Sequence, residues 1–229
     1  IYNNHTGLVR NKGYYQGMDL GEIWGYEAND LFLTNQEVDE YLRGVDMSFF
    51  KPNKDWQRGD LKYIDSNGDG KIDPGSGTLK DHGDLKIIGN TTPRYSFGLN
   101  LHAGYKGFEV SALFQGVMKR DFPMAASTYL FSGDSNFFKE HLDYYNVYNP
   151  GAYLPRLTKP DSPEYNANVG YNTSRYLLNA AYMRLKNLMI SYNFQPKLVK
   201  KMGLENLKVY FTCDNLFTID NLPDVFDPE

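Results

Sequence analysis

The chain has 229 residues, a formal net charge of −4 and no basic block, which argues against a general nucleic-acid-binding protein. Its single cysteine, Cys213, cannot form an internal disulfide, so stability must come from packing, strand pairing or a metal ion. No run approaches 18 apolar residues, which excludes a transmembrane helix, while a mean hydropathy of −0.56 stays compatible with a barrel whose lumen is polar.

The first 33 residues alternate glycine, tyrosine and apolar residues, a pattern that predicts short strands and loops rather than a helix. A short helix is predicted next. Thr34 can cap its first turn, Glu37 completes a capping box three residues later, and Gly44 ends the helix.

The segment DSNGDGKID at residues 65–73 fits the calcium-loop template D-x-[DN]-x-[DN]-G. The template needs side-chain oxygens at its first, third, fifth and ninth positions, a carbonyl at the seventh and a sharp turn at the sixth, where Gly70 stands. Ile72, at the eighth position, is expected to anchor the loop to its neighbours. The predicted ligands within the loop are Asp65, Asn67, Asp69, the carbonyl of Lys71, and Asp73.

The twelfth position of this template departs from the calcium pattern, because Ser76 stands where a bidentate glutamate is expected. Residues 74–82 are interpreted as an insertion, and Asp84 or Asp81 could close the ligand shell, with Asp84 preferred. The alternative interpretation is a solvated Asx turn, since Asp and Asn favour turns without any metal. A catalytic role for these carboxylates is disfavoured, because no matching nucleophile or base lies nearby in the sequence.

Residues 93–118 predict a β-hairpin around the two-residue turn Lys106-Gly107. Apolar side chains occupy the odd positions before the turn and the even positions after it. Each arm has about 11 residues with aromatics at its ends, which suits a strand that crosses the hydrocarbon layer of a bilayer. The positions expected on the polar face include Asn100, His102 and Gln115.

Residues 120–176 predict a long loop rich in tyrosine, asparagine, proline and glycine, with a short helix around residues 137–145. A loop of about 55 residues is usually functional or disordered, and its aromatics disfavour disorder. These aromatics either contact sugars or a partner, or form a miniature core of the loop itself. The four tyrosines considered as contacts are Tyr144, Tyr145, Tyr148 and Tyr153.

A second strand pair is predicted over residues 181–216. In the first strand, apolar or aromatic residues recur at every second position from Leu188 through Ile190 and Tyr192 to Phe194. Residues 195–205 predict a short helix that ends at Gly203, and residues 207–216 predict the second strand.

With these elements placed, nearly the whole chain resembles the C-terminal part of SusC/RagA-type TonB-linked outer-membrane transporters. The combined order of the motifs is more specific than any one of them. The stretches that carry the resemblance are GEIWGYEANDLF (21–32), GDLKYIDSNGDGKID (59–73), IIGNTTPRYSFGLNLHAGYKGFEVSALFQGV (87–117), LPRLT (154–158), YMRLKNLMISYNF (182–194) and LKVYFTCDNLFT (207–218).

The resemblance implies an all-β fold that is part of a transmembrane antiparallel β-barrel, 22-stranded in the family, with long extracellular loops that contain short helices. It implies import of glycans or peptides across the outer membrane of a Gram-negative bacterium, with a SusD-type surface lipoprotein as partner. TonB would act through an N-terminal part that this chain lacks, so we expect the chain to be an excerpt of a longer protein. Outer-membrane lipid is an expected neighbour and nucleic acid is not.

Joined to the rule that such barrels have short periplasmic turns, the resemblance places Lys106-Gly107 in the periplasm and the strands at 93–118 and 181–216 in the membrane. Residues 14–90, with the calcium-like loop at 65–84, and residues 120–176 would then lie outside the cell. The calcium ion would be structural.

Two alternatives from other classes stay open. A soluble, secreted, calcium-stabilised β-sandwich that binds carbohydrate would bury the apolar faces of both hairpin arms in one core. A secreted hydrolase is disfavoured, because the four histidines are scattered and no nucleophile motif is present, so we do not expect an enzyme.

Overall fold

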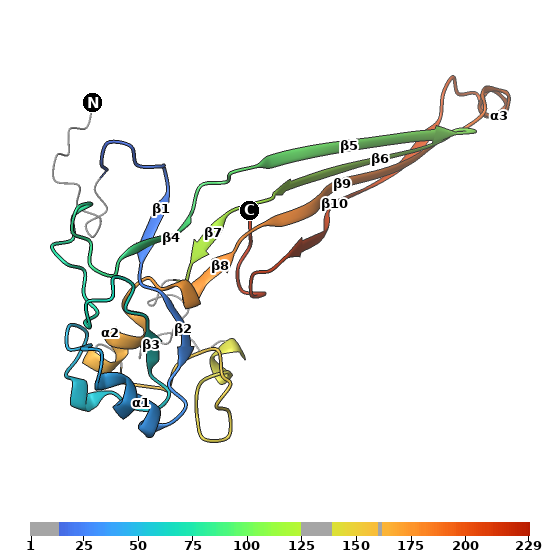
Figure 1. Cartoon of the computed structure of the whole chain (residues 1–229). Helices are drawn as coiled ribbons and strands as arrows, with labels where there is room; N and C mark the ends of the chain where they lie inside the picture. Colours follow the sequence, from blue (N-terminus) through green and yellow to red (C-terminus); the bar gives the residue numbers. More distant parts are fainter. Residues whose placement is uncertain (1–13, 125–138, 160–161) are drawn as a thin grey trace. The chain divides into compact units, whose positions relative to one another are not determined.

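The computed structural model describes residues 14–124, 139–159 and 162–229 and divides them between two compact units (Figure 1). The first unit lies within residues 1–92 and 121–178, and the second comprises residues 93–120 and 179–229. Most of the regular structure is β-strand, with a few short helices.

The first unit contains short paired strands separated by loops, as its glycine-rich and tyrosine-rich sequence predicts. The pairs are β1 (Glu22–Gly25) with β4 (Lys86–Asn90), β2 (Ala28–Leu31) with β3 (Leu61–Tyr63), and β7 (Asp121–Pro123) with β8 (Leu177–Asn179). The first two pairs are antiparallel, and each contains one register shift.

Helix α1 (Asn35–Leu42) confirms the predicted capping box. The backbone amide of Glu37 donates to Thr34 Oγ1 at 3.1 Å, and the Glu37 carboxylate accepts from the backbone amide of Leu33 at 2.9 Å. The carboxylate thus satisfies an amide just before the cap, and the helix ends two residues before Gly44.

The other helices of this unit are short: η1 (Asn53–Asp55), η2 (Lys139–Leu142), α2 (Pro163–Val169) and η3 (Ser174–Tyr176). The helix predicted around residues 137–145 begins outside the described residues, and its described part contains the single 3₁₀ turn η2. Helix α2 escaped prediction, although Ser162 caps it through a hydrogen bond from Tyr165 N and proline opens its first turn.

The core of the first unit is aromatic. Phe50 stacks on Tyr63 with ring centroids 4.2 Å apart, and Tyr26 and Trp56 meet the same two rings edge-on. Burying such large rings removes a large apolar area from water and so stabilises a unit that has few regular elements.

The second unit is one antiparallel sheet in the order β10-β9-β6-β5. Its strands are β5 (Ser96–Tyr105), β6 (Phe108–Val117), β9 (Tyr182–Asn193) and β10 (Lys208–Asp220). Strand β10 extends to Asp220, past the predicted end at Leu216, because Asn215 adopts a φ of 51° inside a bulge and pairing resumes at Phe217.

The turn between β5 and β6 is the predicted two-residue turn, with φ of 47° at Lys106 and 89° at Gly107. Both angles are positive, as a type I′ turn requires. A Cβ on Gly107 would lie 2.7 Å from the carbonyl oxygen of Asn193, so glycine is needed there for space as well as conformation. Between β9 and β10, helix α3 (Pro196–Lys201) lies within the predicted helical segment, and Gly203 follows it with a φ of 76°.

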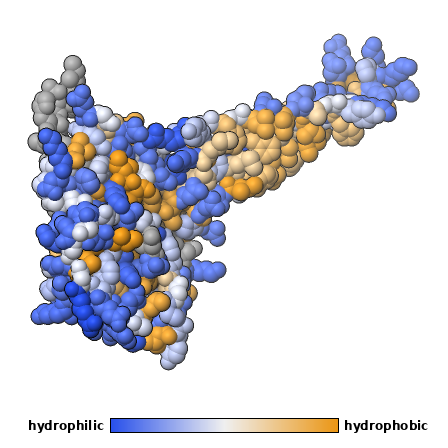
Figure 2. Space-filling view, viewed as in Figure 1, coloured by the Kyte–Doolittle hydropathy of each residue, from blue (hydrophilic) through white to orange (hydrophobic). Residues whose placement is uncertain are grey.

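The register of the second unit aligns apolar residues from all four strands on one face. Rows that illustrate this are Leu101–Ala112–Leu188–Cys213 and Ala103–Val110–Ile190–Phe211. Many of these side chains are exposed, with Leu101 at 50% and Phe211 at 64%. Figure 2 shows apolar surface along this sheet.

No helix in the described part of the chain combines the length and apolar character needed to span a membrane.

Candidate functional site

The calcium-like loop folds around the Asp65 carboxylate, which accepts hydrogen bonds from Gly68 N at 2.6 Å and Gly70 N at 2.8 Å. Gly70 has a φ of 81°, a conformation that side-chain-bearing residues rarely adopt. The sharp turn predicted at the sixth position of the template is therefore present.

The next predicted ligands continue the same pattern of side chain to backbone hydrogen bonds. Asn67 Oδ1 accepts from Asp69 N, and Asp69 Oδ1 accepts from Lys71 N, both at 2.9 Å. Asp73 Oδ1 accepts from Gly75 N at 2.7 Å. Successive Asx turns of this kind also satisfy the alternative interpretation of a turn without a metal.

Asp84 closes this loop from 11 residues beyond Asp73. Asp84 is buried, with 1% of its surface exposed. Its carboxylate accepts hydrogen bonds from Ser66 N at 2.7 Å and from Asp73 N at 2.9 Å. Asp81 instead accepts from Ser76 N at 2.9 Å, inside the turn formed by the insertion. Of the two candidates for closing the loop, Asp84 is the one whose carboxylate accepts hydrogen bonds from the backbone of residues 65–73 in the described structure.

Two groups at this loop have raised pKa values. Burial raises the pKa of Asp84, and the charge of Asp65 adds to the increase, although three backbone hydrogen bonds oppose it. Burial, followed by the charge of Asp65, raises the pKa of Tyr41 to about 12. Within the described residues, no three aspartate, glutamate, histidine or cysteine side chains form a group that could hold a metal ion.

Ile72 anchors the loop, as predicted. It is fully buried, and its backbone amide donates to Asp46 O at 2.9 Å, while Asp46 N donates to Gly70 O at 2.8 Å. The loop backbone is therefore held against the segment that contains Asp46.

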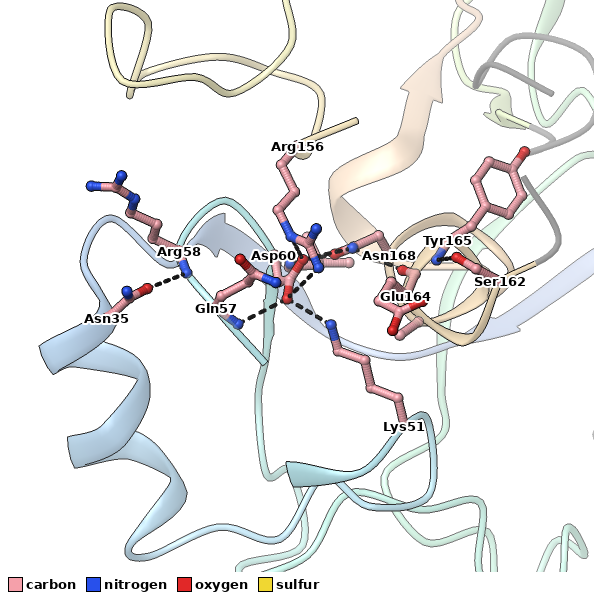
Figure 3. A network of polar contacts seen from close by, with 12 residues as sticks. Asn35, Lys51, Gln57, Arg58, Asp60, Arg156, Ser162, Glu164, Tyr165 and Asn168 are labelled. Atoms are coloured by element: carbon pink, nitrogen blue, oxygen red, sulfur yellow. Dashed lines mark hydrogen bonds and ion pairs between the residues drawn. The ribbon is translucent and has the colours of Figure 1, made fainter. Parts of the chain in front are cut away.

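A buried ionic network centred on Asp60 was missed by the sequence analysis (Figure 3). The Asp60 side chain is fully buried and pairs with Lys51 Nζ at 2.6 Å and Arg156 Nε at 2.6 Å. Gln57 N and Asn168 Nδ2 donate to the same carboxylate at 3.0 and 2.9 Å. Two cations and two neutral donors thus compensate one buried charge.

This network joins two of the stretches that carry the family resemblance. Asp60 belongs to the stretch at 59–73 and Arg156 to LPRLT at 154–158, almost 100 positions later. Arg156 N also donates to Gly59 O at 2.9 Å, and a small cavity of about 30 Å³ lies against LPRLT, next to His141 and α2. No local sequence signal could identify this pairing, because its partners are far apart in the chain.

The four candidate tyrosines have different environments. Tyr145 is buried, donates its hydroxyl to Leu33 O at 2.9 Å and lies against Gly59, so it packs against residues of the first unit that lie outside the 120–176 loop. The Tyr153 hydroxyl donates to Arg175 O at 2.7 Å. Tyr144 is half-buried and Tyr148 is 95% exposed.

The three candidate polar residues of the hairpin lie on one face of the sheet in the second unit. Asn100 pairs with Leu113, His102 with Ser111, and Gln115 with Gly98, which are alternate rows of the β5–β6 ladder. The register also sets Gln115 opposite Arg184 of β9. Leu113 and Met189 are apolar members of this otherwise mainly polar face.

Known proteins with similar sequences are TonB-dependent receptors. TonB-dependent receptor P3 of Formosa agariphila is 28% identical over 216 residues, which cover 93% of this chain and 19% of the relative. TonB-dependent receptor P26 of the same organism is 27% identical over 173 residues, which cover 75% of this chain and 16% of the relative. The chain thus spans less than a fifth of the length of these relatives. No protein-family model matches it.

Solved structures of RagAB share the fold of this chain. The structure of the RagAB peptide transporter aligns with a TM-score of 0.54 and 17% identity over 88% of this chain and 19% of the other. The RagAB peptide importer in its 'open-open' state aligns with a TM-score of 0.55 and 15% identity over 92% and 22% of the two chains. The chain is therefore related to the TonB-dependent receptors, and the predicted resemblance to the C-terminal part of a SusC/RagA-type transporter is confirmed.

Proposed function

We propose that this chain supplies barrel strands and extracellular loops to a transporter that imports glycans or peptides across the outer membrane, driven by TonB. The observation that carries the proposal is the second unit, where four strands of 10 to 13 residues expose one continuous apolar face. Strands of this length suit the hydrocarbon layer, and an exposed apolar face needs lipid or another apolar cover.

The same observation opposes the β-sandwich alternative. That alternative requires the apolar faces of both hairpin arms to be buried in one core, yet Leu101 is 50% and Phe108 is 57% exposed. Transport rather than catalysis is also the role that fits the names of the relatives, which are receptors and transporters.

The proposed orientation places the Lys106-Gly107 turn and α3 in the periplasm and the first unit outside the cell. In the complete protein, neighbouring strands would continue both edges of the sheet toward a 22-stranded barrel. A SusD-type lipoprotein would cover the extracellular side, and an N-terminal part would contact TonB.

Contacts with cargo or the lipoprotein belong, in this proposal, to the exposed loop and to the polar face of the sheet. Tyr148 is the best placed of the loop tyrosines because it is the most exposed, and the half-buried Tyr144 is the second candidate. The hydroxyls of Tyr145 and Tyr153 are already engaged by the carbonyl oxygens of Leu33 and Arg175. Asn100, His102 and Gln115 would line the lumen.

The test is uptake by cells whose receptor gene is deleted and restored with variants of the full-length protein. We expect the wild type to restore TonB-dependent uptake of a labelled glycan or peptide pool and Y148A to lower it several-fold. A matched variant at an exposed helix position, D39N, should keep wild-type uptake. Restored uptake that does not need TonB would overturn the proposal.

We also propose that the 65–84 loop binds calcium as a structural ion. The support is the template match, because the candidate ligands Asp65, Asn67, Asp69, the Lys71 carbonyl, Asp73 and Asp84 offer only oxygen atoms, which a hard cation prefers. The described structure does not gather three of these carboxylates into one group, so binding would have to draw them together. A carboxylate oxygen that accepts one backbone hydrogen bond retains a second lone pair for a cation. External calcium would then stabilise a loop that has few apolar contacts of its own.

Thermal unfolding of the full-length protein, with and without a chelator, tests the calcium proposal. Chelation should lower the melting temperature and release bound calcium, and D65N/D69N should remove both effects. D81N, which lies outside the proposed shell, should keep them. An unchanged melting temperature together with no bound metal in the wild type would refute the site.

A further inference from the structure

A cluster of opposite charges lies on the polar face of the second unit, where residues 227–229 lie against β9. The Arg184 side chain is only 9% exposed, and its guanidinium pairs with Asp227 at 2.6 Å and Glu229 at 2.7 Å. Lys186 Nζ pairs with Glu229 at 2.6 Å. Two basic side chains from one strand thus hold two carboxylates separated by one residue, Pro228.

The Arg184 guanidinium is held in position by the sheet. Its Nε donates to Thr218 Oγ1 of β10 at 2.8 Å, and the register sets Gln115 of β6 on its other side. The fork of the guanidinium is therefore directed at carboxylates by a rigid scaffold, which is the arrangement that recognises carboxylate groups best.

The segment that supplies these carboxylates is held to the sheet by ion pairs and a hydrogen bond, and its Pro228 is buried. Arg120 Nη1 donates to Pro228 O at 3.2 Å, in addition to the pairs with Arg184 and Lys186. The backbone amides of Leu222, Phe226 and Glu229 donate to acceptors within residues 220–229. Asp227 is 67% exposed, so its pair with Arg184 is screened by water and can exchange for another carboxylate.

We propose that Arg184 and Lys186 form a carboxylate-binding site, that Asp227 and Glu229 occupy it as an internal ligand, and that acidic peptides compete for it. This inference rests on the proposed function, since the polar face must line the path of the cargo. An extended peptide with acidic residues at positions i and i+2 reproduces the chemistry of the bound segment. Because the internal ligand is tethered, it raises the concentration of cargo needed to replace it.

Equilibrium binding to the purified full-length receptor in detergent tests the inference without requiring TonB. The probes are acetyl-Asp-Pro-Glu-amide and its neutral analogue acetyl-Asn-Pro-Gln-amide. In D227N/E229Q, which removes the internal carboxylates but keeps both cations, we expect the acidic probe to bind at least about 10-fold more tightly than to the wild type. The neutral probe should show no such gain.

Adding R184Q and K186Q to that variant should abolish the preference for the acidic probe, whereas adding K208Q, which alters another ion pair of the same face, should leave it unchanged. Equal binding of both probes to D227N/E229Q, or a preference that survives loss of Arg184 and Lys186, would overturn the inference. Circular dichroism and heat modifiability confirm that each variant is folded. If the receptor selects the acidic probe but does not import cargo, the carboxylate-binding site is supported and only the proposed transport function is refuted.

Discussion

At the scale of single residues, the first unit depends on a few polar side chains that compensate one another in the interior. Asp60 is fully buried as a side chain and faces two cations, of which Lys51 is equally buried. Burial lowers the pKa of Lys51, although the charge of Asp60 opposes that shift. A pair of this kind stabilises little relative to apolar residues of the same shape, but losing one partner leaves the other charge without compensation.

We therefore expect D60N to weaken the first unit by about 3–5 kcal/mol, because it leaves Lys51 and Arg156 without their carboxylate. Hydrogen exchange of the full-length protein should show faster exchange across β2, β3 and α2. D39N, an exposed change on α1, should shift protection by less than about 0.5 kcal/mol. Protection in D60N equal to that in D39N would show that the network is not needed for stability.

The lowered pKa of Glu37 predicts that the stability of α1 depends on pH. Partial burial raises the pKa of Glu37, but hydrogen bonds from Lys62 and the backbone amides of Leu33 and Thr34 outweigh this and leave it below its usual value. The carboxylate therefore stabilises the helix above the unfolded-state pKa, and this contribution is lost as pH falls through the lower folded-state pKa.

Hydrogen exchange, corrected for the intrinsic pH dependence of exchange, should show α1 losing protection as the solution is acidified through that range. E37Q should be less protected at neutral pH and should lack this pH dependence, while D39N should retain it. The same acid response in E37Q and the wild type would contradict the assignment to Glu37.

At the scale of elements, the register of the second unit determines which side chains lie on its apolar face and which lie on its polar face. Cross-strand register continues the apolar stripe of the hairpin through β9 and β10, with one register shift between β6 and β9 at Leu113/Phe114 and another between β9 and β10 near Asn215. Leu101 and His102 are neighbours in β5 but lie on opposite faces, so they form a matched pair for testing the proposed membrane exposure.

Under the proposed function, L101K places a charge near the middle of the lipid-facing surface and should destabilise the folded barrel by about 2–4 kcal/mol. H102K places the same charge on the lumen face and should cost far less. Reversible unfolding of the full-length protein in lipid vesicles measures both. Equal losses for the two variants would contradict a lipid-facing stripe.

At the scale of the whole molecule, the two units differ in where their apolar side chains lie. The first unit buries an aromatic core and a charge network, whereas the second leaves its apolar face exposed. We predict that the full-length protein fractionates with the outer membrane and needs detergent for extraction. Recovery in the soluble fraction after cell lysis, in folded form, would exclude the proposed location.

Local sequence patterns were sufficient for the elements that depend on near neighbours. Alternation predicted β5, β6 and β9, Lys106-Gly107 predicted the tight turn, and Thr34 with Glu37 predicted the start of α1. Each follows from steric limits or hydrogen bonds within a few residues, and such limits can be read from a single segment.

Tertiary structure decided what depends on distant partners. Only folding brings Arg156 to Asp60, Asp84 to the loop at 65–73, and Asp227 to Arg184, because each pair is separated by many positions and competes with water until it is enclosed. The fold also gives the loop tyrosines different environments, because Tyr145 is buried and Tyr148, three positions later, is exposed. The sequence alone determined the strand pattern, the turn and the family resemblance, and the fold determined which charged and aromatic groups meet, since that depends on long-range packing.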